Sequence, residues 1–228
     1  MRPTHGLAPR ALSLALLLLL APADHAARRS ASGDGSSRDA RRNASAPQNA
    51  SAARFKIDAA RSSFTVRAYA GGVLWFKGHD HIVRVREFAG DVTLAPPSLA
   101  LRVRADSLAE TRDVFTEQQK QIINREMREI VLEADKYPKI TFASTSVRLD
   151  PQAGPPFKAK IEGDLTLHGV TRRITIPAEV TSAGGELRAR GEFSIKRSDF
   201  KVKATSAFHG TVRVRDRLKF TFDIVAVG

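Results

Sequence analysis

Cysteine is absent from this chain of 228 residues, and its absence excludes several chemistries at once. Without thiols the protein has no disulfide bonds, no thiolate nucleophile and no cysteine ligand for a metal. It also lacks the cysteine that carries the lipid of an exported lipoprotein. Stability must therefore come from the core alone, which a folded part of about 175 residues can supply.

Long hydrophobic runs are lacking as well. The most apolar segment, Ala11–Leu20, holds only about ten residues, whereas a helix that spans a membrane needs roughly twenty. Arg2 and Arg10 precede this run and Ala21-Pro22-Ala23 follows it, an order typical of a cleaved signal peptide. We therefore predict a signal peptide over residues 1–23 and a mature protein that is periplasmic or secreted.

Aromatic residues are missing from the segment that follows, residues 24–53, which consists mainly of Ala, Ser, Arg, Asp, Gly and Asn. Such a segment cannot bury enough apolar area to offset the entropy lost on ordering. We expect a disordered linker over residues 24–53 and a folded domain over residues 54–228.

Acidic residues are in the minority, and the formal net charge is +13. The first 53 residues hold seven arginines against three aspartates, which leaves a net charge of +9 for the rest. A basic surface favours anionic partners, such as a phospholipid membrane or a lipid head group. We expect no nucleic-acid partner, because the aromatic residues fall mostly on the apolar faces of strands. Peripheral contact with an anionic membrane and formation of a homodimer stay open.

Strict alternation of apolar and polar residues is the strongest pattern that is present. It runs from Phe157 to Leu167, resumes after His168-Gly169 and continues to Val180. Two alternating runs joined by a short turn that contains glycine predict a β-hairpin with one buried and one solvated face. His168 and Gly169 are then turn residues, since glycine supplies a backbone conformation that other residues resist.

The same alternation recurs along most of the chain after residue 54. It predicts the further strands 54–59, 63–70, 81–95, 99–105, 139–150, 186–196 and 211–227. In 81–95 the apolar residues change parity, which predicts a β-bulge near Arg86 to Phe88. Apolar residues at helical spacing predict one amphipathic helix at about 116–132, with a capping box at Thr116–Gln119. We expect its apolar stripe to pack on one end or flank of the sheet.

Many one-sided strands in meander order favour a sheet that closes on itself. The predicted fold is therefore all-β: an extended eight-stranded antiparallel barrel, similar to lipocalins, with one amphipathic helix after the fourth or fifth strand. Such a barrel has room for side chains or for one small ligand. Gly163 and Gly191 interrupt its inner face, which suits either a packed core or a tunnel that leaves space for an apolar chain.

No enzymatic motif stands out. The sequence has no Gly-x-Ser-x-Gly elbow, and Glu162 and Asp164 lie among lysines, as on a solvated strand surface. We expect no catalysis and no cofactor, apart from a bound isoprenoid or fatty-chain lipid.

His79-Asp80-His81 is the most informative short motif, because two histidines two residues apart on a strand point to the same side. A structural cluster, a polar clamp on a ligand head group and a metal site remain open as alternatives. A metal site would need a third ligand from elsewhere in the chain, with His168 or His209 as the candidates. For Arg197 and Asp199 the alternatives are a local ion pair and contact of Arg197 with an anionic ligand group at the barrel mouth.

Several segments in order resemble the YceI-like family, exported proteins described as binding lipids or polyisoprenoids. The resemblance covers roughly residues 54–228. The segments that carry it are Phe55–Asp58, Ser63-Phe64, Gly78–His81, Phe88–Gly90, Lys136–Thr145, Gly163–Thr171 and Arg197–Phe200.

This resemblance implies a barrel like that of lipocalins, whose apolar tunnel holds an amphiphilic isoprenoid or fatty chain. As ligand-binding residues we predict Trp75, Phe76, His79, His81, Phe193, Arg197, Asp199 and Phe222. The alternative function is a metal-binding or redox-related exported protein that uses His79 and His81. One residue departs from the family pattern: Lys201 stands where glycine is usual, which predicts a loop of different shape there.

Overall fold

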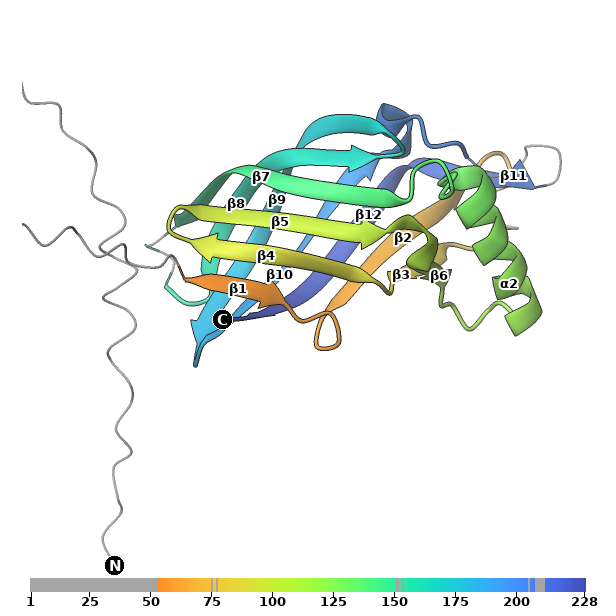
Figure 1. Cartoon of the computed structure of the whole chain (residues 1–228). Coiled ribbons are helices and arrows are strands. Elements are labelled where there is room, and N and C mark those ends of the chain that lie inside the picture. Colours follow the sequence, from red (N-terminus) through yellow and green to blue (C-terminus); the bar gives the residue numbers. More distant parts are fainter. Residues whose placement is uncertain are drawn as a thin grey trace, which may run out of the picture. The chain divides into compact units, whose positions relative to one another are not determined.

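The folded part of the protein is almost entirely β-sheet (Figure 1). The computed structural model describes residues 53–74, 76, 78–150, 152, 154–204, 206–207 and 212–228. The predicted signal peptide (residues 1–23) and residues 24–52 of the predicted linker lie outside these residues. The strands are β1 (Arg54–Ile57), β2 (Ser63–Gly71), β3 (His81–Val85), β4 (Phe88–Leu94), β5 (Pro97–Arg104), β6 (Leu108–Glu110), β7 (Lys139–Asp150), β8 (Phe157–Leu167), β9 (Val170–Ala183), β10 (Glu186–Lys196), β11 (Ser206–Ala207) and β12 (Val212–Val227).

The sheet closes on itself through β12. The hydrogen-bonded ring runs β1-β4-β5-β7-β8-β9-β10-β12 and returns to β1, with every pairing antiparallel. Next to β1, the N-terminal part of β12 pairs with β2, which continues the sheet through β3 and β6. The predicted eight-stranded antiparallel barrel is therefore confirmed.

The predicted strand 81–95 is divided into β3 and β4 by Arg86 and Glu87. Val83 and Val85 before this break and Phe88 after it are all buried. The change of parity in the sequence thus marks a real irregularity in the backbone, and it keeps apolar residues inside along both strands.

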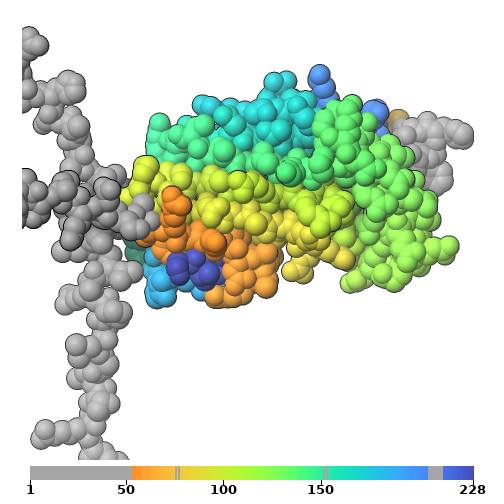
Figure 2. Space-filling view, viewed as in Figure 1, coloured from red at the N-terminus to blue at the C-terminus, as the bar shows by residue number. Residues whose placement is uncertain are grey.

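The helix lies at one end of the barrel (Figure 1). Helix α2 (Glu117–Glu126) continues as a π-helical turn, Met127–Val131, so the two together match the predicted range. The predicted capping box is present: Thr116 Oγ1 accepts from Gln119 N at 3.3 Å, and Gln119 Oε1 accepts from Thr116 N at 2.8 Å. Met127 and Val131 pack against the core. We call this end of the barrel the helix end; Figure 2 shows the green helix forming the surface there.

Among the residues described, no helix is both long and apolar enough to cross a membrane.

The core consists of apolar side chains that project inward from neighbouring strands. The largest cluster of buried residues comprises Leu132, Phe142, Ala159, Ile161, Leu165, Leu167, Ile176, Ala178, Ile195, Phe200 and Val202. Paired residues of adjacent strands share a face, so the pairs Ile161–Ile176 and Ala159–Ala178 place β8 and β9 in one inner layer. The alternation of apolar and polar residues in the sequence thus corresponds to side chains that point into the barrel and side chains that point outward.

Aromatic rings cover the two glycines of the inner face. A Cβ atom at Gly163 would collide with the ring of Phe142 and with the backbone oxygen of Ala143. At Gly191 it would collide with the ring of Phe222 and the backbone oxygen of Pro177. The space that these glycines leave is therefore occupied by neighbouring rings, and it is not the source of a tunnel.

We predict that Gly163→Ala lowers the free energy of unfolding by about 1–3 kcal/mol, because a methyl group must displace a well-packed ring. Asp164→Ala, on the exposed face of the same strand, removes an exposed ion pair with Arg173 and should cost no more than about 1 kcal/mol. Urea unfolding at neutral pH measures both. Equal losses in the two variants would contradict the packing around Gly163.

Candidate functional site

Polar side chains gather at the helix end of an otherwise apolar inner face. His81 pairs with Ala68 across β2 and β3, and Glu110 pairs with Val83 across β3 and β6. Because paired residues share a face, His81 and Glu110 lie on the same face as the buried Val83. Arg197 comes directly after β10, whose last inward residue, Ile195, pairs with Leu218 of β12. The candidate site is this polar end together with the apolar interior behind it.

A hydrogen-bonded histidine–carboxylate pair joins β3 to β6. His81 Nδ1 lies 2.8 Å from Glu110 Oε2, and the side chain of Glu110 has no exposed surface, whereas that of His81 is 26% exposed. The other carboxylate oxygen, Oε1, accepts from three backbone N–H groups, those of Ile82, Thr111 and Arg112. A buried carboxylate needs this many partners to remain charged.

The pKa of Glu110 is lowered by these contacts. Burial alone acts to raise the pKa, but the hydrogen bond from His81 and the backbone N–H groups of Arg112 and Ile82 together outweigh burial. The backbone N–H of Glu110 in turn donates to Asn124 Oδ1 of α2 at 2.7 Å. The carboxylate of Glu110 therefore holds β3, and the backbone of the same residue holds the helix at this end of the barrel.

His79 and His81 both contact the ring of Phe115. His81 stacks on this ring, with centroids 5.3 Å apart and 10° between planes, and His79 meets it edge-on at 5.8 Å. The two histidines thus meet at one aromatic ring, although only His81 lies on β3. Among the described residues, no group of three or more His, Asp and Glu side chains is arranged to hold a metal ion. His209, one predicted candidate for a third ligand, lies outside the described residues.

Arg197 does not pair with Asp199. Its Nη1 donates to the carbonyl oxygen of Val202 at 2.8 Å, and its nearest carboxylate is Asp216, with Nε 3.9 Å from Oδ1. The predicted alternative of a local Arg197–Asp199 ion pair is therefore wrong. Asp199 is exposed, and its backbone oxygen accepts from Arg172 Nε. The acidic partner comes from β12 because the register brings Asp216 beside the end of β10.

Asp216 is held in place by Ser198. One carboxylate oxygen accepts from Ser198 N at 3.0 Å and the other from Ser198 Oγ at 2.8 Å. The side-chain hydrogen bond from Ser198 lowers the pKa of Asp216, and Arg197 adds a smaller electrostatic effect. Asp216 is thus a fixed negative charge beside Arg197.

Lys201 has the backbone conformation that glycine favours. Its φ is 56° and its ψ is 20°, in the left-handed region at the end of the short helix Arg197–Phe200. Glycine adopts this region without a steric penalty, which accounts for glycine at such a position. Lysine therefore accommodates the same backbone here, and the substitution alone does not require a different loop.

Phe193 and Phe222 belong to a group of aromatic rings in the interior. Phe193 stacks on Phe220 with centroids 4.8 Å apart, and Phe222 lies 6.4 Å from Phe193. Phe64 adds an edge contact with Phe88 and a tilted one with Phe220. The predicted residues Phe193 and Phe222 are thus brought together, in the apolar part of the site and not at its polar end.

Trp75, Phe76 and His168 were also singled out by the sequence. Trp75 is outside the described residues, and Phe76 is 63% exposed. His168 is a turn residue, as predicted, with φ of 52° followed by Gly169 at 71°. It is also buried, and its Nε2 lies 2.5 Å from Glu133 Oε2. This pair ties the β8–β9 turn to the segment after the helix.

Sequence reasoning missed Glu110, Asp216, Arg213 and Arg215. Glu110 lies on a strand of only three residues, which is too short to show a period. Arg213 and Arg215 are two residues apart on β12. Two basic residues at this spacing were a usable signal, but the register of β12 shifts between Val214 and Leu218, so strand periodicity alone does not give the faces of their side chains.

We predict that Glu110→Gln lowers the free energy of unfolding by about 2 kcal/mol near neutral pH, because a buried charged hydrogen bond is lost. The lowered pKa means that ionised Glu110 stabilises the fold above the ordinary glutamate pKa of about 4.3. This contribution disappears as the pH falls through the lowered value. The difference between wild type and variant should therefore shrink in acid.

Urea unfolding at a series of pH values measures this difference. Glu87→Gln is the matched control, since Glu87 forms an exposed ion pair with Arg104 that contributes about 0–1 kcal/mol. A wild-type-to-Glu110→Gln difference that is the same at acidic and neutral pH would contradict the buried-charge assignment.

Comparison with known proteins identifies the family and the fold. A family model described as the YceI-like domain matches residues 55–226. A UPF0312 protein of Vibrio campbellii is 32% identical over 167 residues, which cover 68% of this chain and 81% of the relative. A UPF0312 protein of Vibrio parahaemolyticus is 33% identical over 145 residues, 61% of this chain and 69% of the relative. Protein YceI of Shigella flexneri is 41% identical over 78 residues, 32% of this chain and 38% of the relative.

Two solved structures have the same fold. BcnA of Burkholderia cenocepacia superposes with a TM-score of 0.58 at 22% identity, over 75% of this chain and 99% of that chain. A polyisoprenoid binding domain from Saccharophagus degradans superposes with a TM-score of 0.56 at 16% identity, over 78% of this chain and 99% of that chain. With the match over residues 55–226, the chain belongs to the YceI-like family, as its motifs predicted.

Proposed function

We propose that this protein binds and carries a long-chain amphiphile, such as a polyisoprenoid or a fatty-chain lipid. The apolar chain lies in the barrel interior and the polar head lies at the helix end. The observation that carries the proposal is the distribution of polarity along the inner face: apolar along the barrel, and charged at the helix end around His81, Glu110 and Arg197.

Incomplete burial of inward side chains supports room for a chain. Several apolar side chains point into the barrel and pack against the core, yet they are only partly buried. Their strands are hydrogen-bonded to a neighbouring strand on each side, so this accessible surface does not come from a free sheet edge. These side chains include Val147, Leu149, Ile174, Val180, Phe193, Leu218, Phe220 and Phe222. A tightly packed interior would leave such side chains little accessible surface, whereas a ligand chain would cover them.

The energetics favour a long chain. Burial of ten methylene groups contributes about 8 kcal/mol, and association costs about 4–15 kcal/mol. A short chain therefore gives little net affinity, and a chain well above ten carbons is the natural ligand. The Saccharophagus degradans domain with the same fold is described as polyisoprenoid binding, which favours an isoprenoid over a straight fatty chain.

The proposal includes no catalysed reaction. The two histidine–carboxylate pairs that could act in acid–base chemistry have structural positions. His81–Glu110 joins two strands, and His168–Glu133 joins a turn to the segment after the helix. Binding and release of the ligand are sufficient for a carrier.

Export is part of the same proposal, because a carrier outside the cytoplasm suits a water-insoluble ligand. Arg2 and Arg10, the apolar run Ala11–Leu20 and the small residues that follow it support a cleaved signal peptide. N-terminal sequencing of the mature protein should begin at Asp24, whereas a chain that retains Met1 would count against export.

We predict that Ile174→Trp reduces the lipid bound to the purified protein. Ile174 lies on the inner face opposite Gly163, and a larger side chain there competes with the ligand chain for space. An overpacking cost of about 1–3 kcal/mol corresponds to a loss of affinity of about five- to 150-fold. Mass spectrometry of organic extracts from the native protein measures the molar ratio of lipid to protein.

Thr175→Trp is the matched control, since Thr175 is the next residue and is exposed on the outer face. It should retain as much lipid as the wild type, and circular dichroism establishes that both variants are folded. Equal lipid retention in the two tryptophan variants would contradict a ligand inside the barrel.

A further inference from the structure

Like charges lie opposite one another on the outer face of the barrel, towards the helix end. Lys196 pairs with Arg217 across β10 and β12, and Lys219 pairs with Arg67 across β12 and β2. These side chains point outward, because adjacent residues along the strands belong to the core or pack against it. Like charges directly opposite in a sheet destabilise it. An anionic partner on this face would relieve the repulsion.

Acidic residues offset only part of this charge. Lys219 forms an ion pair with Glu192 at 2.8 Å, and Arg67 forms one with Asp80 at 3.2 Å. The two cations paired across β10 and β12 are exposed, and neither forms an ion pair with any residue that the structure describes. Arg84 is exposed on the neighbouring strand β3 and extends the positive charge. We call these five cations the basic strip: Arg67, Arg84, Lys196, Arg217 and Lys219.

Exposed apolar side chains follow directly after β2. Val73 is 83% exposed and Phe76 is 63% exposed. The end of their loop is joined to a second segment, since Arg112 Nη1 donates to the carbonyl oxygen of Asp80 at 2.8 Å. Val114 of that segment is 45% exposed. Val73, Phe76 and Val114 together form what we call the apolar tip. Exposed apolar patches with a polar rim mark sites of contact with proteins or membranes.

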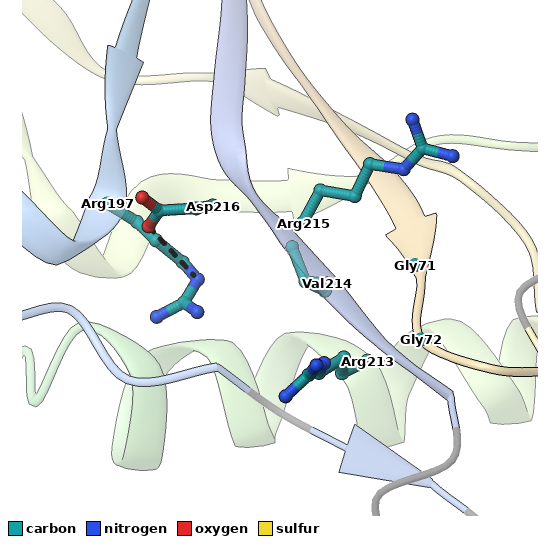
Figure 3. Close-up of a pocket in the computed structure, with 7 residues that line it drawn as sticks. All are labelled: Gly71, Gly72, Arg197, Arg213, Val214, Arg215 and Asp216. Carbon is teal, nitrogen blue, oxygen red and sulfur yellow. Dashed lines mark ion pairs between the residues drawn. The ribbon is translucent and has the colours of Figure 1, made fainter.

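Two arginines lie at the base of the apolar tip. Gly71, the last residue of β2, pairs with Arg213 of β12, and the aliphatic part of Arg215 lies against Gly71. Both arginines are exposed. Figure 3 shows them beside the end of β2, where they line a cavity of about 360 Å³ together with Arg197 and Asp216. The apolar tip is thus bordered by positive charge.

We propose that the basic strip and the apolar tip dock this protein on a bilayer that contains anionic phospholipid. A bilayer offers negative charge at its surface and an apolar medium beneath it, so it matches both features at once. A polyanion such as a nucleic acid would neutralise the strip but leave Val73 and Phe76 in water. The inference goes beyond the proposed function, because it concerns the outer surface and holds whatever the barrel interior contains.

Co-sedimentation with vesicles tests the basic strip, with the mature protein and vesicles of phosphatidylcholine alone or mixed with phosphatidylglycerol. Wild type should bind the mixed vesicles on the order of tenfold more tightly or better, and added salt should weaken this binding. The double variant Lys196→Gln, Arg217→Gln should bind them on the order of tenfold more weakly. It should remain folded, since the change removes a repulsion between exposed residues.

The matched control is the double variant Lys158→Gln, Lys160→Gln. It removes the same charge from exposed residues of β8 and should retain the binding of wild type. All variants share the segment 24–53, so its five arginines contribute equally to every measurement. Equal losses in the two double variants would overturn the basic strip as the docking surface.

Fluorescence of the single tryptophan tests the apolar tip. Trp75 lies between Val73 and Phe76 in the sequence, and its emission should shift to shorter wavelength when mixed vesicles are added. Val73→Ser and Phe76→Ser should each weaken binding on the order of tenfold. Val227→Ser, at a partly exposed residue near the other end of β12, is the control and should bind as wild type does.

The outcomes also identify other occupants of this surface. Equal binding to neutral and mixed vesicles, or binding without a shift of the tryptophan emission, would contradict docking through charge and the apolar tip. A dimer in analytical ultracentrifugation that Val73→Ser dissociates, with no binding to vesicles, would assign the tip to a second copy of the chain and overturn the proposal. The lipid content of the docking variants should equal that of wild type, so lipid binding is tested separately.

Discussion

The pairing of β12 with β10, β1 and β2 is the interaction on which the rest of the structure depends. β12 runs beside β10 along most of its length, while its C-terminal end pairs with β1 and its N-terminal part pairs with β2. This closure removes free sheet edges around the ring and turns one-sided strands into an apolar interior. It also places Asp216 beside Arg197 and brings Arg213 to the same cavity.

Two ends of one interior thus have different chemistry. Along the barrel, aromatic and aliphatic side chains face one another, as in the stack of Phe193 on Phe220. At the helix end, the buried Glu110 is held by His81 and three backbone N–H groups. A charge buried there is tolerable only because every acceptor has a donor. This polarity along one axis is what an amphiphile with one apolar chain and one charged head would match.

Local patterns predicted the strands and the helix well, because each is specified by neighbouring residues. The ranges of β7 and β10 follow directly from alternation of residues 139–150 and 186–196, and the helix start follows from Thr116 and Gln119. Contacts between residues of different strands were harder to predict from the sequence. The partner of Arg197 depends on register and proved to be Asp216, and Gly163 is filled by Phe142 from the adjacent strand. Such contacts form between segments distant in sequence, and no local pattern specifies them.

The central claim is that the barrel interior holds the apolar chain of a lipid whose head lies at the helix end. A crystal structure of the protein purified with its bound lipid tests this most directly. The account predicts continuous electron density along the inner face, past Phe193 and Phe222, that ends beside Arg197. An interior filled by side chains alone, with lipid density only on the outer surface, would contradict it.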